Sequence, residues 1–274
     1  MKKIDAHIHY RLGNNRISPL VQQSGHDDTG SYLREAFAQE NIVHAIVMSN
    51  LNLSADPVEQ NYPDFLSYCA GIGQDSLSPE KHEQSVAMAE QHLLRPSCVG
   101  LKIYAGYSHY NLDDPLYYPF YELARRYKKP VAVHMGATAH ARALLRYCHP
   151  MQMDQVAVSF PDVSFVMCHF GNPFLMDAAA VVEKNANVSV DLSGLIAGSF
   201  DVLAYIRKLS GYVEQLKTWI AYVEDYSKFM FGTDFPLTGF GEYLKLFEYI
   251  IPEEHWESFY FENAKRIYGL PDSL

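Results

Sequence analysis

Two histidines separated by one residue, His7 and His9, stand at the end of an apolar run near the start of the chain. Because side chains on a strand alternate between its two faces, both imidazoles should project to the same side, with Asp5 one step deeper. The apolar residues of the run are then expected to face the other way, under helices: Ile4, Ala6 and Ile8. Two imidazoles in this position need partners, which either hydrogen-bonding groups or a divalent metal ion can supply. The pair alone does not choose between these alternatives.

Four more residues of ligand type stand at the ends of other apolar runs, and they favour the metal. These residues are Lys102, His134, His169 and Asp234. The runs are rich in Val, Ile, Phe or Tyr, which is typical of buried strands. Strands are therefore predicted over residues 2–10, 43–49, 66–72, 98–104, 130–136, 163–169, 187–193 and 228–234.

Between these runs, apolar residues recur at intervals of three and four, which indicates helices. Helices are predicted over residues 31–41, 79–94, 114–127, 173–185, 201–209, 211–226, 241–250 and 253–269. Strands that alternate with helices form a parallel sheet, either an open doubly wound sheet or a closed barrel. Only a closed barrel brings strand ends from the whole sheet to one rim, so we expect a single α/β domain over residues 1–274, a (β/α)8 TIM barrel.

The composition excludes several classes of partner. The chain has 22 basic and 32 acidic residues, a net charge of −10, which argues against nucleic acid. No run approaches 18 consecutive apolar residues, and the start lacks the apolar segment of a secretory signal, so we expect no membrane contact. The four cysteines are isolated, which favours a reducing cytoplasm. One of them, Cys168, is expected to face away from its neighbour His169 and to pack as a small hydrophobe.

Five short motifs together resemble a known family. They are DAHIH (5–9), GLKIY (100–104), VAVHMG (131–136), VMCHFG (166–171) and FGTDFP (231–236). In this order they resemble the signatures of the amidohydrolase superfamily, most closely its branch of aminocarboxymuconate-semialdehyde decarboxylase-like metal-dependent hydrolases. The resemblance runs from Asp5 to Leu270. It implies a barrel that holds one or two divalent ions at the rim where its strands end.

The resemblance also implies a ligand set. His7, His9, His134 and Asp234 would bind the catalytic metal, and His169 would either activate water and substrate or bind a second metal. Three histidines and a carboxylate suit Zn²⁺, with Mn²⁺ or Fe²⁺ as alternatives.

The roles of three charged residues stay open. Lys102 could be carbamylated and bridge two ions, as in two-metal members of the superfamily, or it could pair with a carboxylate at the barrel mouth. Asp5 and Asp191 could each accept the outer N–H of a ligand histidine, or belong to a polar network without such a role.

The leading functional hypothesis is hydrolysis of an amide, lactone or other ester bond in a small molecule by a metal-activated water. In it, Asp234 transfers the proton, and His169 polarises the scissile carbonyl or stabilises the oxyanion. Loop residues that could hold the substrate are Arg11, Tyr104, Arg142 and Asn172. The alternative is non-oxidative decarboxylation of an unsaturated or aromatic acid. A barrel that only binds ligands would show a broken ligand set, and no position is broken. The oligomeric state is open, and a homo-oligomer is one alternative.

Overall fold

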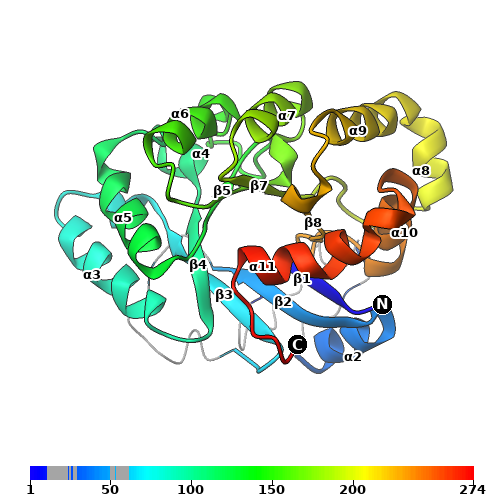
Figure 1. The fold of residues 1–274 in the computed structure, drawn as a ribbon, viewed down its shortest axis with the longest axis horizontal. Coiled ribbons are helices and arrows are strands. Elements are labelled where there is room, and N and C mark those ends of the chain that lie inside the picture. The colour runs from blue at the N-terminus through cyan, green and yellow to red at the C-terminus, as the bar shows by residue number, and fades with distance from the viewer. Residues whose placement is uncertain (11–23, 25, 27–29, 50–52, 54–61) are drawn as a thin grey trace.

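Eight parallel strands form a barrel in which each strand pairs with the next one along the chain (Figure 1). The computed structural model describes all residues except 11–23, 25, 27–29, 50–52 and 54–61. The strands are β1 (Lys3–Ile8), β2 (Ile42–Met48), β3 (Leu66–Ile72), β4 (Cys98–Ile103), β5 (Val131–His134), β6 (Phe165–Cys168), β7 (Val188–Asp191) and β8 (Phe229–Met230). Each strand overlaps a predicted one, and the predicted α/β barrel is confirmed.

The segment that follows β8 closes the ring against β1. The backbone N–H of His9 donates to the carbonyl of Phe235 at 2.7 Å, and the N–H of Asp234 donates to the carbonyl of His7 at 2.8 Å. These two bonds hold the first and last predicted ligands side by side, although they lie at opposite ends of the chain. The closed ring is therefore what brings them together.

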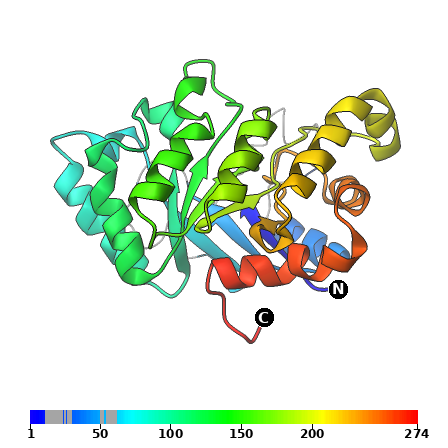
Figure 2. The ribbon, with the colours of Figure 1, turned by 45° about the horizontal axis from the view of Figure 1, so that its top comes forward.

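Most of the helices surround the ring on its outside (Figure 1 and Figure 2). The helices are α2 (Gly30–Glu40), α3 (His82–Leu93), α4 (Ala105–Ser108), α5 (Tyr118–Tyr127), α6 (Met151–Ser159), α7 (Leu175–Lys184), α8 (Val202–Lys208), α9 (Ser210–Tyr222), α10 (Phe240–Ile250) and α11 (Asn263–Ile267). In the part of the chain that the structure describes, none of them has the length and apolarity needed to span a bilayer.

The helix predictions differ from the structure at three places, one of which is the short helix α4, which was not predicted. The sequence analysis does not predict α6, whose buried residues Met153, Val156 and Ala157 cover only about one turn, too short a stretch for a periodicity signal. The helix predicted over 253–269 is divided into a 3-10 turn, a π-helical turn (Ser258–Glu262) and α11.

Apolar side chains form two layers, one between the sheet and the helices and one inside the barrel. The expectation for β1 is partly wrong. Ile8 packs under the helices, but Ile4 and Ala6 belong to the interior layer. The pairing of β1 with β2 shifts register between Asp5 and Ile8, and such an irregularity reverses the alternation of side chains. His7 therefore still faces inward.

Helix α11 covers the end of the barrel at which the strands begin. Its residue Ala264 and the following Tyr268 and Leu270 pack with the interior layer. The side-chain amide of Asn263 donates to the carbonyls of Tyr226 and Phe229, at the start of β8, both at 2.8 Å. This end is therefore filled by the C-terminal segment, and the opposite end carries the polar residues.

We expect His44, a buried histidine of β2, to make stability depend on pH. Its side chain contacts the hydroxyl of Ser67 at 2.9 Å, and burial lowers its pKa from 6.5 to about 4. The unfolded chain binds this proton more readily than the folded protein does. The contribution of His44 to the free energy of unfolding should therefore be fully present above pH 6.5, and it should be lost as the pH drops towards 4. The loss should amount to about 2 kcal/mol between about pH 8 and about pH 5.

Urea unfolding of the native protein and of His44→Gln over this range measures the effect. The variant should show a flatter dependence on pH. Ser67→Ala should keep the dependence of the native protein, because burial and not the hydroxyl contact shifts the pKa. Equal slopes for the native protein and His44→Gln would contradict the prediction.

Candidate metal centre and active site

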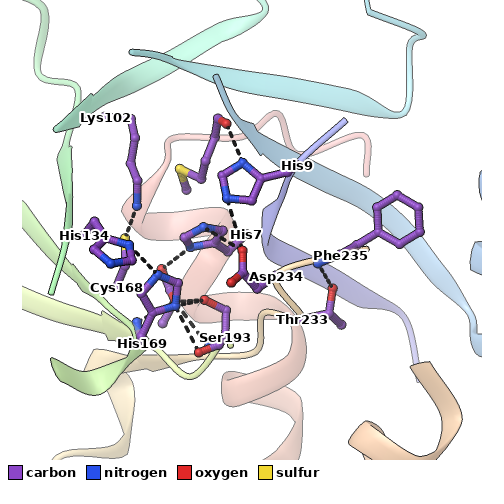
Figure 3. Close-up of polar contacts among 12 residues, drawn as sticks. His7, His9, Lys102, His134, Cys168, His169, Ser193, Thr233, Asp234 and Phe235 are labelled. Atoms are coloured by element: carbon purple, nitrogen blue, oxygen red, sulfur yellow. Dashed lines mark hydrogen bonds and ion pairs between the residues drawn. The ribbon is translucent and has the colours of Figure 1, made fainter. Parts of the chain in front are cut away.

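The predicted ligand residues gather at the rim where the strands end (Figure 3). His7 lies near the end of β1, and His9 follows that strand directly. His134 is the last residue of β5, His169 follows β6, and Asp234 lies shortly after β8. Five residues from four strands thus point into one space, at the end of the barrel that carries active sites in this fold.

Three of these residues form one group of ligand atoms. Asp234 Oδ1 lies 3.4 Å from His7 Nε2 and 3.1 Å from His9 Nε2. One ligand atom from each of the three residues lies within 4.8 Å of the other two. This spacing lets one ion contact all three.

His134 and His169 form a second group beside the first. His134 Nδ1 lies 3.0 Å from His169 Nε2. The ring centroid of His169 lies 4.8 Å from that of His7 and 4.7 Å from that of His134. His134 therefore lies at the same rim as the other predicted ligands, and the ring of His169 lies close to both His134 and His7.

Hydrogen bonds determine which ring nitrogen carries the proton in His7 and His9. His7 Nδ1 lies 3.0 Å from the carboxylate of Asp191, and His9 Nδ1 lies 3.0 Å from the carbonyl of Met48. Both partners can only accept, so each Nδ1 donates. In the neutral rings, the lone pairs of both Nε2 atoms face Asp234.

The same argument applies to the second group. His134 Nε2 donates to the carbonyl of Ala137 at 2.9 Å, which leaves its Nδ1 as an acceptor. His169 Nδ1 donates to the carbonyl of Ser193 at 3.1 Å and lies 2.9 Å from the hydroxyl of the same residue. His169 Nε2 is then also an acceptor, and two lone pairs face each other between these rings.

The rim therefore holds four imidazole lone pairs and one carboxylate, and these repel one another unless a cation lies among them. His7 Nε2 and Asp234 Oδ1 are buried and have no hydrogen-bond partner among the described residues. Unpaired buried polar atoms are rare in proteins, and a metal ion would satisfy both. Nitrogen and oxygen donors of this kind fit Zn²⁺, Mn²⁺ or Fe²⁺.

Burial keeps most of these groups in the forms that bind a metal. It lowers the pKa of His7 to about 4, and it lowers the pKa of His134 and of His169 as well. Burial alone would raise the pKa of Asp234, but positive charge on the neighbouring imidazoles stabilises the carboxylate and holds this pKa well below its ordinary value. Near neutral pH, these three rings are therefore neutral and the carboxyl is ionised.

Of the two carboxylates considered as partners of a ligand histidine, Asp191 has this contact and Asp5 does not. Burial alone would raise the pKa of Asp191, but the imidazole of His7 keeps it well below its ordinary value. Asp5 accepts from the backbone N–H of His7 and from the N–H and hydroxyl of Thr233. Asp5 therefore supports the turn before Asp234, and burial raises its own pKa to about 7.

Lys102 and Cys168 contact each other inside the barrel. Lys102 Nζ donates to Cys168 Sγ at 2.8 Å, and both side chains are fully buried. No carboxylate lies within 4.0 Å of Lys102 among the described residues, so the ion pair, one of the two alternatives for this residue, is not found. The expectation that Cys168 faces away from the site is wrong. His169 has a φ of 63°, which breaks the alternation after β6, so that both side chains turn inward.

A cavity of about 250 Å³ opens beside His134, His169 and Asp234. Its remaining walls consist of small or apolar residues, with two polar ones: Ala137, Thr138, Ala139, Asn172, Gly194, Ala197 and Leu237. The reactive groups therefore face a pocket of the size of a small molecule.

The predicted substrate residues lie in different places. Asn172 lines the cavity. Tyr104 stacks on His134, and its hydroxyl donates to the carbonyl of Ser49 at 3.1 Å, so it supports the ligand ring. Arg142 is exposed and is not among the cavity residues. Arg11 lies outside the described residues.

Sequence reasoning missed Ser193 and Gly194, which follow β7. A Cβ atom built on Gly194 would lie 2.8 Å from Asp234 Oδ2 and 2.9 Å from His169 Nδ1, closer than real Cβ contacts. The only signal was the Ser-Gly pair at the end of the strand predicted over residues 187–193.

A comparison with known protein families finds one whose description is amidohydrolase, and it matches residues 4–270. The chain belongs to the amidohydrolase family. The resemblance seen in the motifs is thus confirmed, and the protein is an enzyme of this superfamily, with a candidate metal site at the rim.

Solved structures share the amidohydrolase barrel at low sequence identity. An uncharacterised TIM-barrel protein from Bordetella bronchiseptica is 18% identical, with 98% of this chain and 99% of that chain covered and a TM-score of 0.70. Another is a 5-carboxyvanillate decarboxylase from Novosphingobium aromaticivorans, complexed with manganese and 4-hydroxy-3-methoxy-5-nitrobenzoic acid. It is 11% identical, with 98% of this chain and 96% of that chain covered and a TM-score of 0.68.

A third is a probable 2-pyrone-4,6-dicarboxylic acid hydrolase from Acinetobacter baumannii with citric acid bound. It is 15% identical, with 98% of this chain and 100% of that chain covered and a TM-score of 0.63. At such identities these likenesses show the fold alone. No curated protein matches the chain.

We expect Gly194→Ala to weaken metal binding, because its methyl group would displace Asp234 and His169. Gly198→Ala is the matched control. Both glycines have positive φ, 64° and 86°, but nothing lies within 4 Å of a Cβ at Gly198. Both variants should lose about 1 kcal/mol of stability from the backbone strain. Chelator competition should show weaker zinc binding in Gly194→Ala only. Equal affinities in the two variants would contradict the prediction.

Proposed function

We propose that this amidohydrolase is a metal-dependent hydrolase that cleaves an amide, lactone or other ester bond of a small molecule. The observation that supports it most is that imidazole nitrogens and carboxylate oxygens, two of them without a hydrogen-bond partner among the described residues, converge beside the cavity. His7, His9, His134 and Asp234 would hold the ion, for which zinc is our first choice and manganese or iron the alternatives. When bound, such an ion supplies Lewis acidity that polarises a carbonyl and makes water a better nucleophile.

Two residues are in position to carry the proton. Asp234 Oδ2 lies next to Gly194 at the cavity wall, so the carboxylate can take a proton from water and return it to the leaving group. His169 presents Nε2 as an acceptor, so its neutral ring takes a proton from the reaction. It can polarise a carbonyl or stabilise an oxyanion only after it has become an imidazolium.

The walls of the cavity support a neutral acyl substrate. Ala137, Ala139, Ala197 and Leu237 offer methyl groups to the substrate, and no lysine or arginine is among the described residues that line the cavity. Asp234, which also lines it, carries a negative charge. A carboxylic acid, the substrate that a decarboxylase needs, would find no cationic side chain on these walls and could pair only with the bound ion, which favours a neutral substrate.

We expect Asp234→Asn to fold normally and to lose about 10³-fold in kcat, because the amide cannot accept the proton. Asp234 has a φ of 61°, a conformation that Asn tolerates as well as Asp does. Circular dichroism and steady-state kinetics check the two expectations. Asp201→Asn, which changes the exposed cap of α8 and touches neither the cavity nor the metal group, is the matched control and should keep full activity. Full activity in Asp234→Asn would rule out the proposed role.

The reaction type itself is tested with the metal-replete protein and a panel of neutral lactones and amides together with unsaturated and aromatic carboxylic acids. Proton release on the lactones or amine release on the amides would support hydrolysis. Release of CO₂ from the acids, without turnover of the neutral compounds, would replace hydrolysis by decarboxylation.

A further inference from the structure

Asp191, the last residue of β7, is fully buried and accepts hydrogen bonds on both carboxylate oxygens. Oδ2 accepts from His7 Nδ1 at 3.0 Å. Oδ1 accepts from the backbone N–H of His169 at 3.1 Å, from the backbone N–H of Ser193 at 3.2 Å, and from the hydroxyl of Ser193. The two oxygens therefore differ in their partners: Oδ2 accepts from the imidazole of His7, and Oδ1 accepts from two backbone N–H groups and one hydroxyl.

We propose that Asp191 is a positioning residue for the metal group, which keeps the proton of His7 on Nδ1 and so leaves Nε2 free to bind an ion. The proposal rests on the metal-dependent function proposed above. A neutral imidazole has one proton and two nitrogens, so a firm acceptor at one nitrogen determines the state of the other. His7 Nε2 is the buried atom without a partner that faces Asp234, and a proton there would point at the place of the ion.

The three donors on Oδ1 make Asp191→Asn a sharp test. An asparagine at this position must place its amide oxygen where Oδ1 lies, because that side receives two N–H groups and one O–H group. Its NH₂ group must then face His7 Nδ1. Because NH₂ donates, Nδ1 has to become an acceptor, and the proton moves to Nε2. The shape of the side chain hardly changes, but the imidazole presents an N–H to the metal group.

The experiment measures the tautomer directly. Metal-free protein labelled with ¹⁵N-histidine gives two-bond proton–nitrogen correlations that distinguish Nδ1–H from Nε2–H rings, and His7 is assigned by the loss of its signals in His7→Gln. We expect Nδ1–H in the native protein and Nε2–H in Asp191→Asn. Chelator competition with zinc should show a dissociation constant raised about 10- to 100-fold in Asp191→Asn.

Asp5→Asn is the matched control, because it also removes a buried carboxylate next to residue 7. Asp5 accepts from the backbone N–H of His7 and does not contact its ring, so this variant should keep the Nδ1–H form. A shift to Nε2–H in both variants would mean that loss of charge, and not contact with the ring, sets the tautomer, and would overturn the proposal.

Three further outcomes would also overturn it: an Nε2–H ring in the metal-free native protein, an Nδ1–H ring in Asp191→Asn, or a changed tautomer with unchanged zinc affinity. The first does not depend on Asp191→Asn, so the proposal stays testable even if that variant does not fold. None of these measurements involves a substrate. A failure of the proposed hydrolysis would therefore be seen in the activity panel and would leave the tautomer result intact.

Discussion

Repulsion between unshared electron pairs is the constraint on which this site depends. The N–H groups of His7, His9, His134 and His169 all donate to acceptors outside the cluster, and their remaining nitrogens face one another and the carboxylate of Asp234. No arrangement of the protons of neutral rings satisfies these atoms. A cation does, and the protein keeps the cluster only because the fold prevents the rings from turning away.

The barrel holds this cluster at the cost of unusual backbone. His169, Gly194 and Asp234 have φ values of 63°, 64° and 61°, and for residues other than glycine such conformations cost about 1–3 kcal/mol each. The hydrogen bond from the N–H of Asp234 to the carbonyl of His7 and the buried contacts of Asp191 offset this cost. The strained backbone thus lies just after the strand ends, where the side chains must converge, and the regular strands that precede it hold it in place.

The inward-facing acceptors also connect the structure to the proposed chemistry. A site that presents only lone pairs to its ion can accept protons but cannot donate them until one has been taken up. In the hydrolysis that we propose, Asp234 and His169 begin as bases, and the methyl groups of Ala137 and Leu237 keep the neutral acyl group beside them. The candidate ligands and the groups that would carry the proton lie at the same rim.

The sequence by itself determined the order of the strands and of most helices, and it indicated His7, His9, His134, His169 and Asp234 at strand ends. The reason is that periodicity reports burial and strand ends meet at one rim. The hydrogen-bond partners were decided only by the tertiary structure. Asp191, and not Asp5, contacts the imidazole of His7, since the irregular pairing of β1 turns one carboxylate away and the closed ring brings β7 near. Cys168 lies in the interior layer together with Val166, and the positive φ of His169 turns the next side chain inward as well. Spacing along a chain records which face a residue occupies, whereas contacts between strands depend on the register of the closed barrel.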